Sequence, residues 1–239
     1  MDEGDAKVKL AIMQPYFLPY IGYFQLMAAV DVFVIYDRIK YTKKGWINRN
    51  RMLLNGHDEM FTLPLHKASD SCDIIERDLA HDFDADTLLR QWRGAYAKAP
   101  YFDAIYPLLE RIMQQPERNL FHFIHASLIE VARYLGITTE IRIASEIPID
   151  HALRGQEKVI ALCEALKAET YINAIGGTEL YDRESFAARG ITLNFIRAKP
   201  ITYPQFGNEF VPWLSILDVL MFNPREVVQG WVDQHFELL

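Results

Sequence analysis

The chain has 239 residues, of which 50% are hydrophobic and 24% are charged, a composition typical of a globular protein that can bury a sizeable core. Its net charge of -7 at pH 7 excludes a general electrostatic attraction to nucleic acid or to an anionic membrane. The two cysteines, Cys72 and Cys163, show no C-x-x-C spacing, which argues against a disulfide framework or a zinc ribbon.

The N-terminal residues 1–5 are acidic, whereas a signal peptide requires positive charge there. No apolar run approaches the length that spans a bilayer, so we expect no transmembrane segment. Sparse cysteines also suit a reducing compartment. The sequence therefore predicts a cytoplasmic protein.

The first predicted unit covers residues 10–52. Apolar runs predict a strand over residues 10–13, a helix over 23–29 and a second buried strand over 32–36. A loop rich in proline and aromatic residues connects the first strand to the helix. Open α/β sheets bind ligands at the carboxyl ends of parallel strands, so we expect the functional site at this end of the unit.

The middle of the chain is predicted to be helical over about residues 84–135. Asp84 caps a helix over 85–98, and helical spacing predicts further helices over 101–113 and 119–135, the last ended by Gly136. The pattern leaves open whether this segment covers the sheet or forms a lid. Short strands are predicted before it, at residues 61–65 and 74–79.

The C-terminal part alternates between strand and helix patterns. Strands are predicted at residues 141–144, 170–175 and 191–196, and helices at 155–166, 183–188, 213–221 and 224–235. This alternation predicts an α/β fold with a Rossmann-like, mostly parallel sheet and a helical middle segment. We expect a single domain over residues 1–239.

Polar side chains follow the first two predicted strands. Gln14 comes directly after the first strand and Asp37 after the second, so both are candidates for catalysis in one cleft. Asp37 could act as a general base toward an amine or hydroxyl. The alternative is an ion pair between Asp37 and Arg38 or Lys43.

Residues 40–51 concentrate lysine and arginine in an otherwise acidic protein. Arginine grips anions, and asparagine hydrogen-bonds hydroxyls and amides, so this segment is a candidate site for a phosphate, carboxylate or sugar-nucleotide ligand. Single-stranded nucleic acid is the rival ligand, and a solvated hairpin is the structural alternative. We favour the small anion and expect no nucleic-acid partner. The candidate residues are Lys43, Trp46, Asn48, Arg49 and Asn50.

Further candidates lie in the C-terminal half. Gly177 and Thr178 follow a strand and could bring backbone amides close to an anion, although a Gly-Gly pair is also a common turn. Tyr181, Tyr203 and Gln205 could stack on and hydrogen-bond a sugar. The alternative for Tyr203 is a rigid turn before Pro204.

No metal site is predicted. The seven histidines form no H-E-x-x-H motif, and His122 and His125, three residues apart, lack a nearby carboxylate. Cys163 is expected in the core, and Cys72 is a weak nucleophile candidate without an identifiable histidine partner. No cofactor can be assigned from these patterns.

Several distinctive segments occur along the chain, at residues 14–24 (QPYFLPYIGYF), 31–34, 45–50, 170–171, 181, 203–206, 210–212 and 214–218. Together they resemble the WbqC-like family across nearly the whole chain. The resemblance implies a role in O-antigen (lipopolysaccharide) and related bacterial surface-polysaccharide synthesis. It further implies attachment of an acyl or aminoacyl group to an amino sugar, with a sugar nucleotide and an acyl or aminoacyl donor as partners.

The loop after the first strand is also similar to nucleotidyltransferases of the HIGH-motif superfamily. The H-x-G-H positions correspond here to Tyr20-Ile21-Gly22-Tyr23, so tyrosines replace both histidines. A tyrosine can donate a hydrogen bond to phosphate but cannot supply positive charge at neutral pH. Tyr20 and Tyr23 are therefore candidates for substrate binding, and the structural alternative is that they are half-buried loop aromatics. Tyr16 of the same loop is a further candidate for substrate binding.

These observations leave three functions open. The first is acyl or aminoacyl transfer to the amine of a sugar nucleotide. The second is nucleotidyl transfer, which requires a nucleoside triphosphate. The third is non-catalytic binding of a sugar nucleotide or glycan, so the sequence does not decide whether the protein is an enzyme.

Overall fold

The computed structural model describes residues 7–69, 71–207 and 209–239. In this part of the chain the main sheet has six strands, in the order β5-β2-β1-β6-β7-β8. Neighbouring strands are parallel except for β7 and β8, which are antiparallel. The bounds are β1 (Val8–Met13), β2 (Val32–Ile35), β5 (Glu140–Ile143), β6 (Ala168–Ala174), β7 (Thr192–Ala198) and β8 (Phe236–Leu238).

The central strands are apolar along their length because helices cover both faces of the sheet. In β1, Leu10 and Ile12 belong to one cluster of buried residues, whereas Ala11 between them belongs to the other. Helices α5 (Gly155–Ala165) and α6 (Arg183–Ala187) pack on the first side. The expected Rossmann-like α/β fold with a mostly parallel sheet is confirmed.

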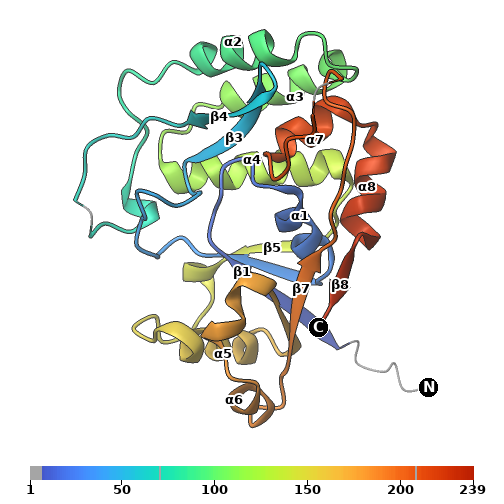
Figure 1. Cartoon of the computed structure of the whole chain (residues 1–239). Helices are drawn as coiled ribbons and strands as arrows, with labels where there is room; N and C mark the ends of the chain where they lie inside the picture. Colours follow the sequence, from blue (N-terminus) through green and yellow to red (C-terminus); the bar gives the residue numbers. More distant parts are fainter. Residues whose placement is uncertain (1–6, 70, 208) are drawn as a thin grey trace.

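The opposite face is covered by α1 (Ile21–Ala28) and α8 (Arg225–Gln234), which contact each other. Figure 1 shows α5 and α6 below the sheet and α1, α4 and α8 above it. Helix α7 (Ile216–Phe222) lies on the same side as α1 and α8.

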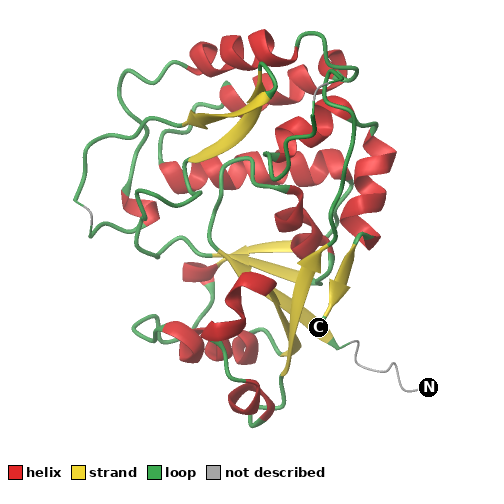
Figure 2. Ribbon diagram, viewed as in Figure 1, coloured by secondary structure: helices red, strands yellow, loops and turns green. Residues whose placement is uncertain are grey.

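The middle segment forms α2 (Ala85–Tyr96), α3 (Phe102–Met113) and α4 (Leu120–Leu135), beside a hairpin of β3 (Arg49–Leu54) and β4 (His57–Thr62). Figure 2 shows these helices stacked beyond the α1 face of the sheet. Their buried side chains join the same core cluster as Phe33 of β2. The middle segment therefore extends the core.

Local signals set the ends of these helices as predicted. The Asp84 side chain accepts a hydrogen bond from the Asp86 amide, 3.0 Å away, at the start of α2. The Asn119 side chain likewise caps α4 by accepting from the Phe121 amide at 3.1 Å. Gly136 ends α4 in the left-handed conformation, with φ 73°.

Other predicted elements differ from the structure. The strand expected at residues 74–79 was wrong: the segment begins with a 3₁₀ helix, η1 (Ile74–Glu76), because Asp73 and Glu76 form a capping box. The strand expected at 61–65 is the end of β4, and it stops before Pro64. Gly177 and Thr178, for which a turn was the alternative, lie within a second 3₁₀ helix, η3 (Ile175–Leu180).

Helix α7 starts at Ile216, three residues later than expected. Trp213 has φ 62°, which interrupts a right-handed helix, and the Ser215 side chain then caps α7 by accepting from the Leu217 amide at 3.2 Å. A further 3₁₀ helix, η2 (Ala144–Glu146), follows β5. None of the described helices has the length and apolar character needed to cross a membrane.

Candidate functional site

A cavity of about 420 Å³ opens at the carboxyl ends of the parallel strands. Its wall includes Met13, Ala174 and Ala198, which are the last residues of β1, β6 and β7. The chain leaves β1 toward β2 on one side, whereas β6 lies on the other side of β1. The cavity therefore lies beside the topological switch point of the sheet, where open α/β folds bind ligands.

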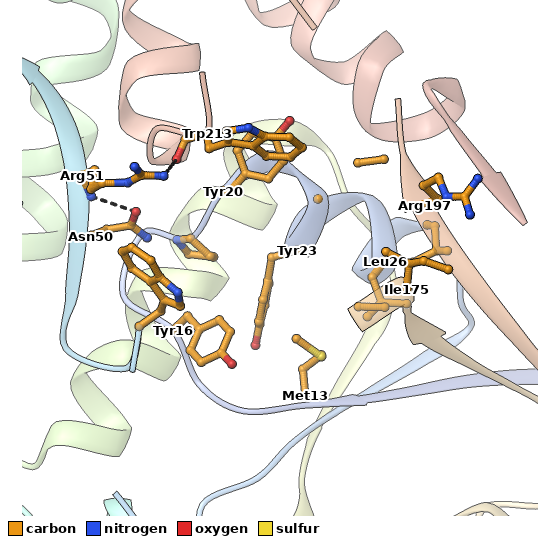
Figure 3. A pocket seen from close by; sticks show the side chains of 16 residues that line it. Met13, Tyr16, Tyr20, Tyr23, Leu26, Asn50, Arg51, Ile175, Arg197 and Trp213 are labelled. Atoms are coloured by element: carbon orange, nitrogen blue, oxygen red, sulfur yellow. Dashed lines mark hydrogen bonds between the residues drawn. The ribbon is translucent and has the colours of Figure 1, made fainter. Parts of the chain in front are cut away.

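The opposite wall consists of segments that are far apart in the sequence. It comes from the loop before α1, from α1 itself, from residues 46–51 and from the loop before α7. Aromatic side chains dominate this wall, and Figure 3 shows Tyr16, Tyr20, Tyr23 and Trp213 around the space. Trp46 completes the aromatic lining.

Tyrosine hydroxyls of this wall are organised by Gln14. The Tyr23 hydroxyl donates to the Gln14 backbone carbonyl at 2.9 Å, and the Tyr16 hydroxyl donates to the Gln14 side-chain oxygen at 3.3 Å. The rings of Tyr16 and Tyr23 lie 5.8 Å apart. Gln14 itself does not line the cavity, so its place is to orient these two tyrosines.

The H-x-G-H positions lie at the N-terminus of α1. Tyr20 precedes the first residue of the helix, and Tyr20, Gly22 and Tyr23 all line the cavity. Burial raises the pKa of Tyr20, and it raises the pKa of the more deeply buried Tyr23 well above its ordinary value. Both phenols are thus neutral hydrogen-bonding groups at physiological pH.

Arg51 and Asn50 connect the hairpin to the cavity wall. The guanidinium of Arg51 pairs with Asp58 at 3.2 Å. It also donates to the Trp213 carbonyl at 3.1 Å, and Figure 3 shows this bond. Asn50 is buried and donates to the Leu18 carbonyl at 3.0 Å. Asn50 was predicted as a binding residue, whereas Arg51 was missed although it closes the basic segment.

Arg197 brings a second guanidinium, on the opposite side of the cavity from Arg51 (Figure 3). Its exposed side chain faces Glu237 of β8 at 3.9 Å. The sequence had no signal for Arg197, because the strand predicted at 191–196 ended one residue before it. Trp213 was missed as well, since a solvated tryptophan within a predicted helix carries no functional pattern.

Other predicted residues of the basic segment shape the loop instead of lining the cavity. Asn48 is buried, accepts from the Tyr41 hydroxyl at 2.8 Å and donates to the Leu63 carbonyl at 2.8 Å. Arg49 donates to the carbonyls of Gly45 and Lys44, at 3.0 Å and 2.7 Å. Lys43 is exposed and lies outside the cavity lining.

Asp37 lies behind the carboxyl end of β2 and is not part of the cavity lining. Its side chain is 2% exposed and accepts a hydrogen bond from the Ser145 amide at 3.1 Å. Its backbone carbonyl accepts from the Ile75 amide at 3.1 Å. Asp37 therefore connects β2 to the short helices η1 and η2, a contact that the sequence pattern did not indicate.

Tyr203 and Gln205 meet a buried carboxylate behind the wall. Asp218 accepts from the Tyr203 hydroxyl and from the Gln205 amide, each at 2.7 Å, and from the Tyr96 hydroxyl at 2.9 Å. Burial raises the pKa of Asp218, and these three hydrogen bonds oppose the shift. The network stabilises α7 and the loop before it, and neither Tyr203 nor Gln205 lines the cavity.

The predicted glycine-rich site also lies outside the cavity. Gly177 is buried, and a Cβ there would lie 2.4 Å from the side-chain amide nitrogen of Asn173, so a larger residue would force that side chain to move. Thr178 is exposed, and Tyr181 packs edge-on against Tyr171 at 5.6 Å. Among the described residues, no cluster of three or more His, Cys, Asp or Glu side chains could hold a metal ion.

Comparison with known proteins gives a family but no function. The model of the WbqC-like protein family matches residues 14–229. The chain is 30% identical over 220 residues to the uncharacterized protein Rv1507c of Mycobacterium tuberculosis, a match that covers 90% of this chain and 93% of that protein. No solved structure matches the chain at a significant level. The matched region includes nearly the whole cavity wall, and the chain belongs to the WbqC-like protein family.

Proposed function

We propose that the protein binds a nucleotide-activated amino sugar in the cavity and transfers an acyl or aminoacyl group to its amine, in the synthesis of O-antigen and related surface polysaccharides. The observation that carries the proposal is the aromatic cavity beside the switch point, flanked by Arg51 and Arg197. Membership of the chain in the WbqC-like family supports the same proposal.

The lining suits each part of such a ligand. Aromatic rings stack on nucleobases and on the apolar faces of sugars. One guanidinium group can donate two parallel hydrogen bonds to the oxygens of a phosphate. Phenol and amide groups, here Tyr16, Tyr23 and Asn50, hydrogen-bond sugar hydroxyls. A volume of about 420 Å³ also falls within the range of ordinary ligand pockets.

The transfer needs no group beyond the two substrates and a hydrogen-bond donor. The neutral amine nitrogen attacks the carbonyl carbon of a thioester or ester donor and forms the amide bond. The bond from that carbon to sulfur or oxygen breaks, and the amine proton ends on the leaving thiol or alcohol. The neutral hydroxyl of Tyr20, unlike those of Tyr16 and Tyr23, does not donate to Gln14, so it can donate to the carbonyl oxygen while negative charge develops on that oxygen.

One observation favours non-catalytic binding as the second candidate. Among the described residues that line the cavity, none is an aspartate, glutamate, histidine, lysine or cysteine. General acid–base and covalent catalysis rely mainly on these residue types. A protein that presents or carries a sugar nucleotide would need only the stacking and arginine contacts.

The test is a thermal-shift screen with nucleoside-diphosphate sugars, with and without an amine, followed by mass analysis with thioester and aminoacyl donors. Ligands that bind the native state raise Tm. Loss of a charged hydrogen bond in Arg51→Ala should weaken binding about tenfold or more. Arg189→Ala is the control, because Arg189 pairs with Glu164 on the α5 side of the sheet, away from the cavity.

The outcomes separate the candidates. A mass gain on the amino sugar supports the transferase, and binding without a mass gain across the donor panel supports the binding protein. A Tm increase with nucleoside triphosphate and Mg²⁺ alone would support nucleotidyl transfer and defeat both.

A further inference from the structure

Exposed tryptophans stand at one end of the cavity. The residue Trp46 is 41% exposed and Trp213 is 57% exposed, although both line the cavity. Both also contact Arg51: its guanidinium carbon lies 5.5 Å from the centre of the Trp46 ring, and it donates to the Trp213 carbonyl. Large aromatic side chains left open to solvent beside a cavity indicate a ligand-contacting surface.

The backbone of Trp213 is held in a conformation that tryptophan disfavours. Its φ is 62°, in the left-handed region where side chains other than glycine are strained. Two hydrogen bonds to Arg51 of β3 hold this backbone conformation in place. The Arg51 guanidinium donates to the Trp213 carbonyl, and the Ser215 amide donates to the Arg51 carbonyl at 2.9 Å. Such strain persists where the surrounding structure fixes it, often at ligand sites.

The strained backbone presents the indole ring to the cavity. The rings of Trp213 and Tyr20 are in tilted contact, with centroids 5.2 Å apart and planes inclined by 54°. Figure 3 shows the two rings next to each other at the cavity. Tyr20 thus contacts the indole ring, and more than half of Trp213 stays exposed to solvent. The result is a pre-oriented stacking platform.

We propose that this end of the cavity, formed by Trp46, Arg51 and Trp213, binds the nucleobase and diphosphate of the sugar nucleotide, so that the sugar points inward toward Tyr16 and Tyr23. The inference rests on the proposed function and adds the orientation of the ligand. It names Trp213 as the residue that stacks on the base.

The chemistry of the two ends supports this orientation. A nucleobase is a flat π system that stacks on an indole and tolerates partial exposure, and single bases are commonly held on aromatic platforms. Arg51 lies between the tryptophans and can pair with the adjacent phosphates. The inner end instead carries phenol hydroxyls on Tyr16 and Tyr23, which suit the many hydroxyls of a sugar.

The test compares the nucleoside diphosphate, the complete sugar nucleotide and the free amino sugar, each titrated by calorimetry into wild type and Trp213→Gly. Glycine adopts the left-handed conformation without strain, so this substitution removes the ring and keeps the backbone. Stacking losses on alanine substitution indicate about tenfold weaker binding or more for the nucleoside diphosphate and the sugar nucleotide. Trp213→Phe keeps a ring and should retain most of the affinity.

Phe206→Gly is the matched control. Phe206 is also an exposed aromatic residue, 45% exposed with φ 53°, but it lies outside the cavity lining. Its substitution should leave all three affinities unchanged. If the glycine variant fails to fold, Trp46→Ala replaces it, because Trp46 is exposed at the same end of the cavity and its loss should also weaken binding of the nucleoside diphosphate.

The results distinguish the inference from the function on which it rests. If the sugar nucleotide binds wild type but Trp213→Gly binds the nucleoside diphosphate equally well, the orientation is wrong and the proposed function stands. If Trp213→Gly loses only the free amino sugar, the ligand lies in the reverse direction. If wild type binds no nucleotide ligand, the proposed function itself fails.

Discussion

Asp218 illustrates how a buried residue outside the cavity lining can support the cavity wall. It is fully buried and accepts hydrogen bonds from Tyr96, Tyr203 and Gln205. In Asp218→Asn an amide N–H₂ replaces one acceptor oxygen, which leaves a buried donor without a partner. We expect the free energy of unfolding in urea to fall by about 1–3 kcal/mol. Asp233→Asn, at an exposed position on α8, should change it little.

The same residue predicts a pH dependence of stability. The pKa of Asp218 in the folded protein is raised above its ordinary value of 3.8, so the unfolded chain loses this proton first as pH rises. The protonated Asp218 carboxyl therefore makes its whole contribution to the free energy of unfolding below pH 3.8. This contribution is lost as the pH rises through the raised pKa of the folded state. The stability difference between wild type and Asp218→Asn should narrow over this window. A difference that widens with pH, measured by urea unfolding, would contradict the assignment.

At the scale of elements, replacing either of two glycines in or at the end of a helix by alanine should change the free energy of unfolding in opposite directions. Gly94 lies within α2, and a Cβ there would have no neighbour within 4 Å, so Gly94→Ala should raise the free energy of unfolding by roughly 1 kcal/mol. Gly136 ends α4 with φ 73°, and its Cβ would approach Gln229 to 3.0 Å. Gly136→Ala should therefore lower stability by about 1–2 kcal/mol. Equal effects in urea unfolding would refute this account of the helix ends.

The contact between elements that matters most for the site joins the β3–β4 hairpin to the loop before α7. Figure 3 shows it as the hydrogen bond between Arg51 and Trp213. The bond between Arg51 and the Trp213 carbonyl connects positions 162 residues apart along the chain. The Ser215 side chain also donates to the Leu18 carbonyl at 2.6 Å, which ties the loop before α7 to the loop after β1. These bonds hold the aromatic wall together without a continuous secondary-structure element.

At the scale of the whole molecule, ligand binding should protect distant segments together. Hydrogen exchange measured with and without a sugar nucleotide should slow in residues 16–23, 46–51 and 213–216, because all of them line or hold the cavity. Exchange in α5 and α6, across the sheet, should stay unchanged. Protection restricted to residues 40–51 would instead support a simple anion site on the basic segment.

Much of the fold followed from local patterns. The strand at residues 10–13, the Asp84 and Asn119 helix starts and the Gly136 helix end lie where the sequence placed them. These signals are local, since periodicity and caps act over a few residues. The prediction failed at residues 74–79, where a capping box outweighed a short apolar run that looked like a strand.

The site was only partly predictable. Tyr16, Tyr20, Tyr23, Trp46 and Asn50 line the cavity as the pattern suggested, and other candidates, such as Asn48 and Tyr203, lie in buried hydrogen-bond networks beside or behind it. In the sequence, a polar or aromatic residue near a strand end has the same pattern whether it lines the cavity or joins a buried hydrogen-bond network. Only its direction in the fold separates a residue that faces a ligand from one that supports the wall.

The sequence by itself determined the α/β class, most helices, the parallel strands β1, β2, β5, β6 and β7, and the family, because these depend on local periodicity and on motifs near β1. It did not indicate β3 or β8, which pair with neighbours in the fold. The tertiary structure alone decided which side chains share the cavity. It brought Arg197 and Trp213 to the aromatic loop and placed Asp37 and Tyr203 elsewhere. The physical reason is that contacts between distant segments depend on packing of the whole core, which no short stretch of sequence encodes.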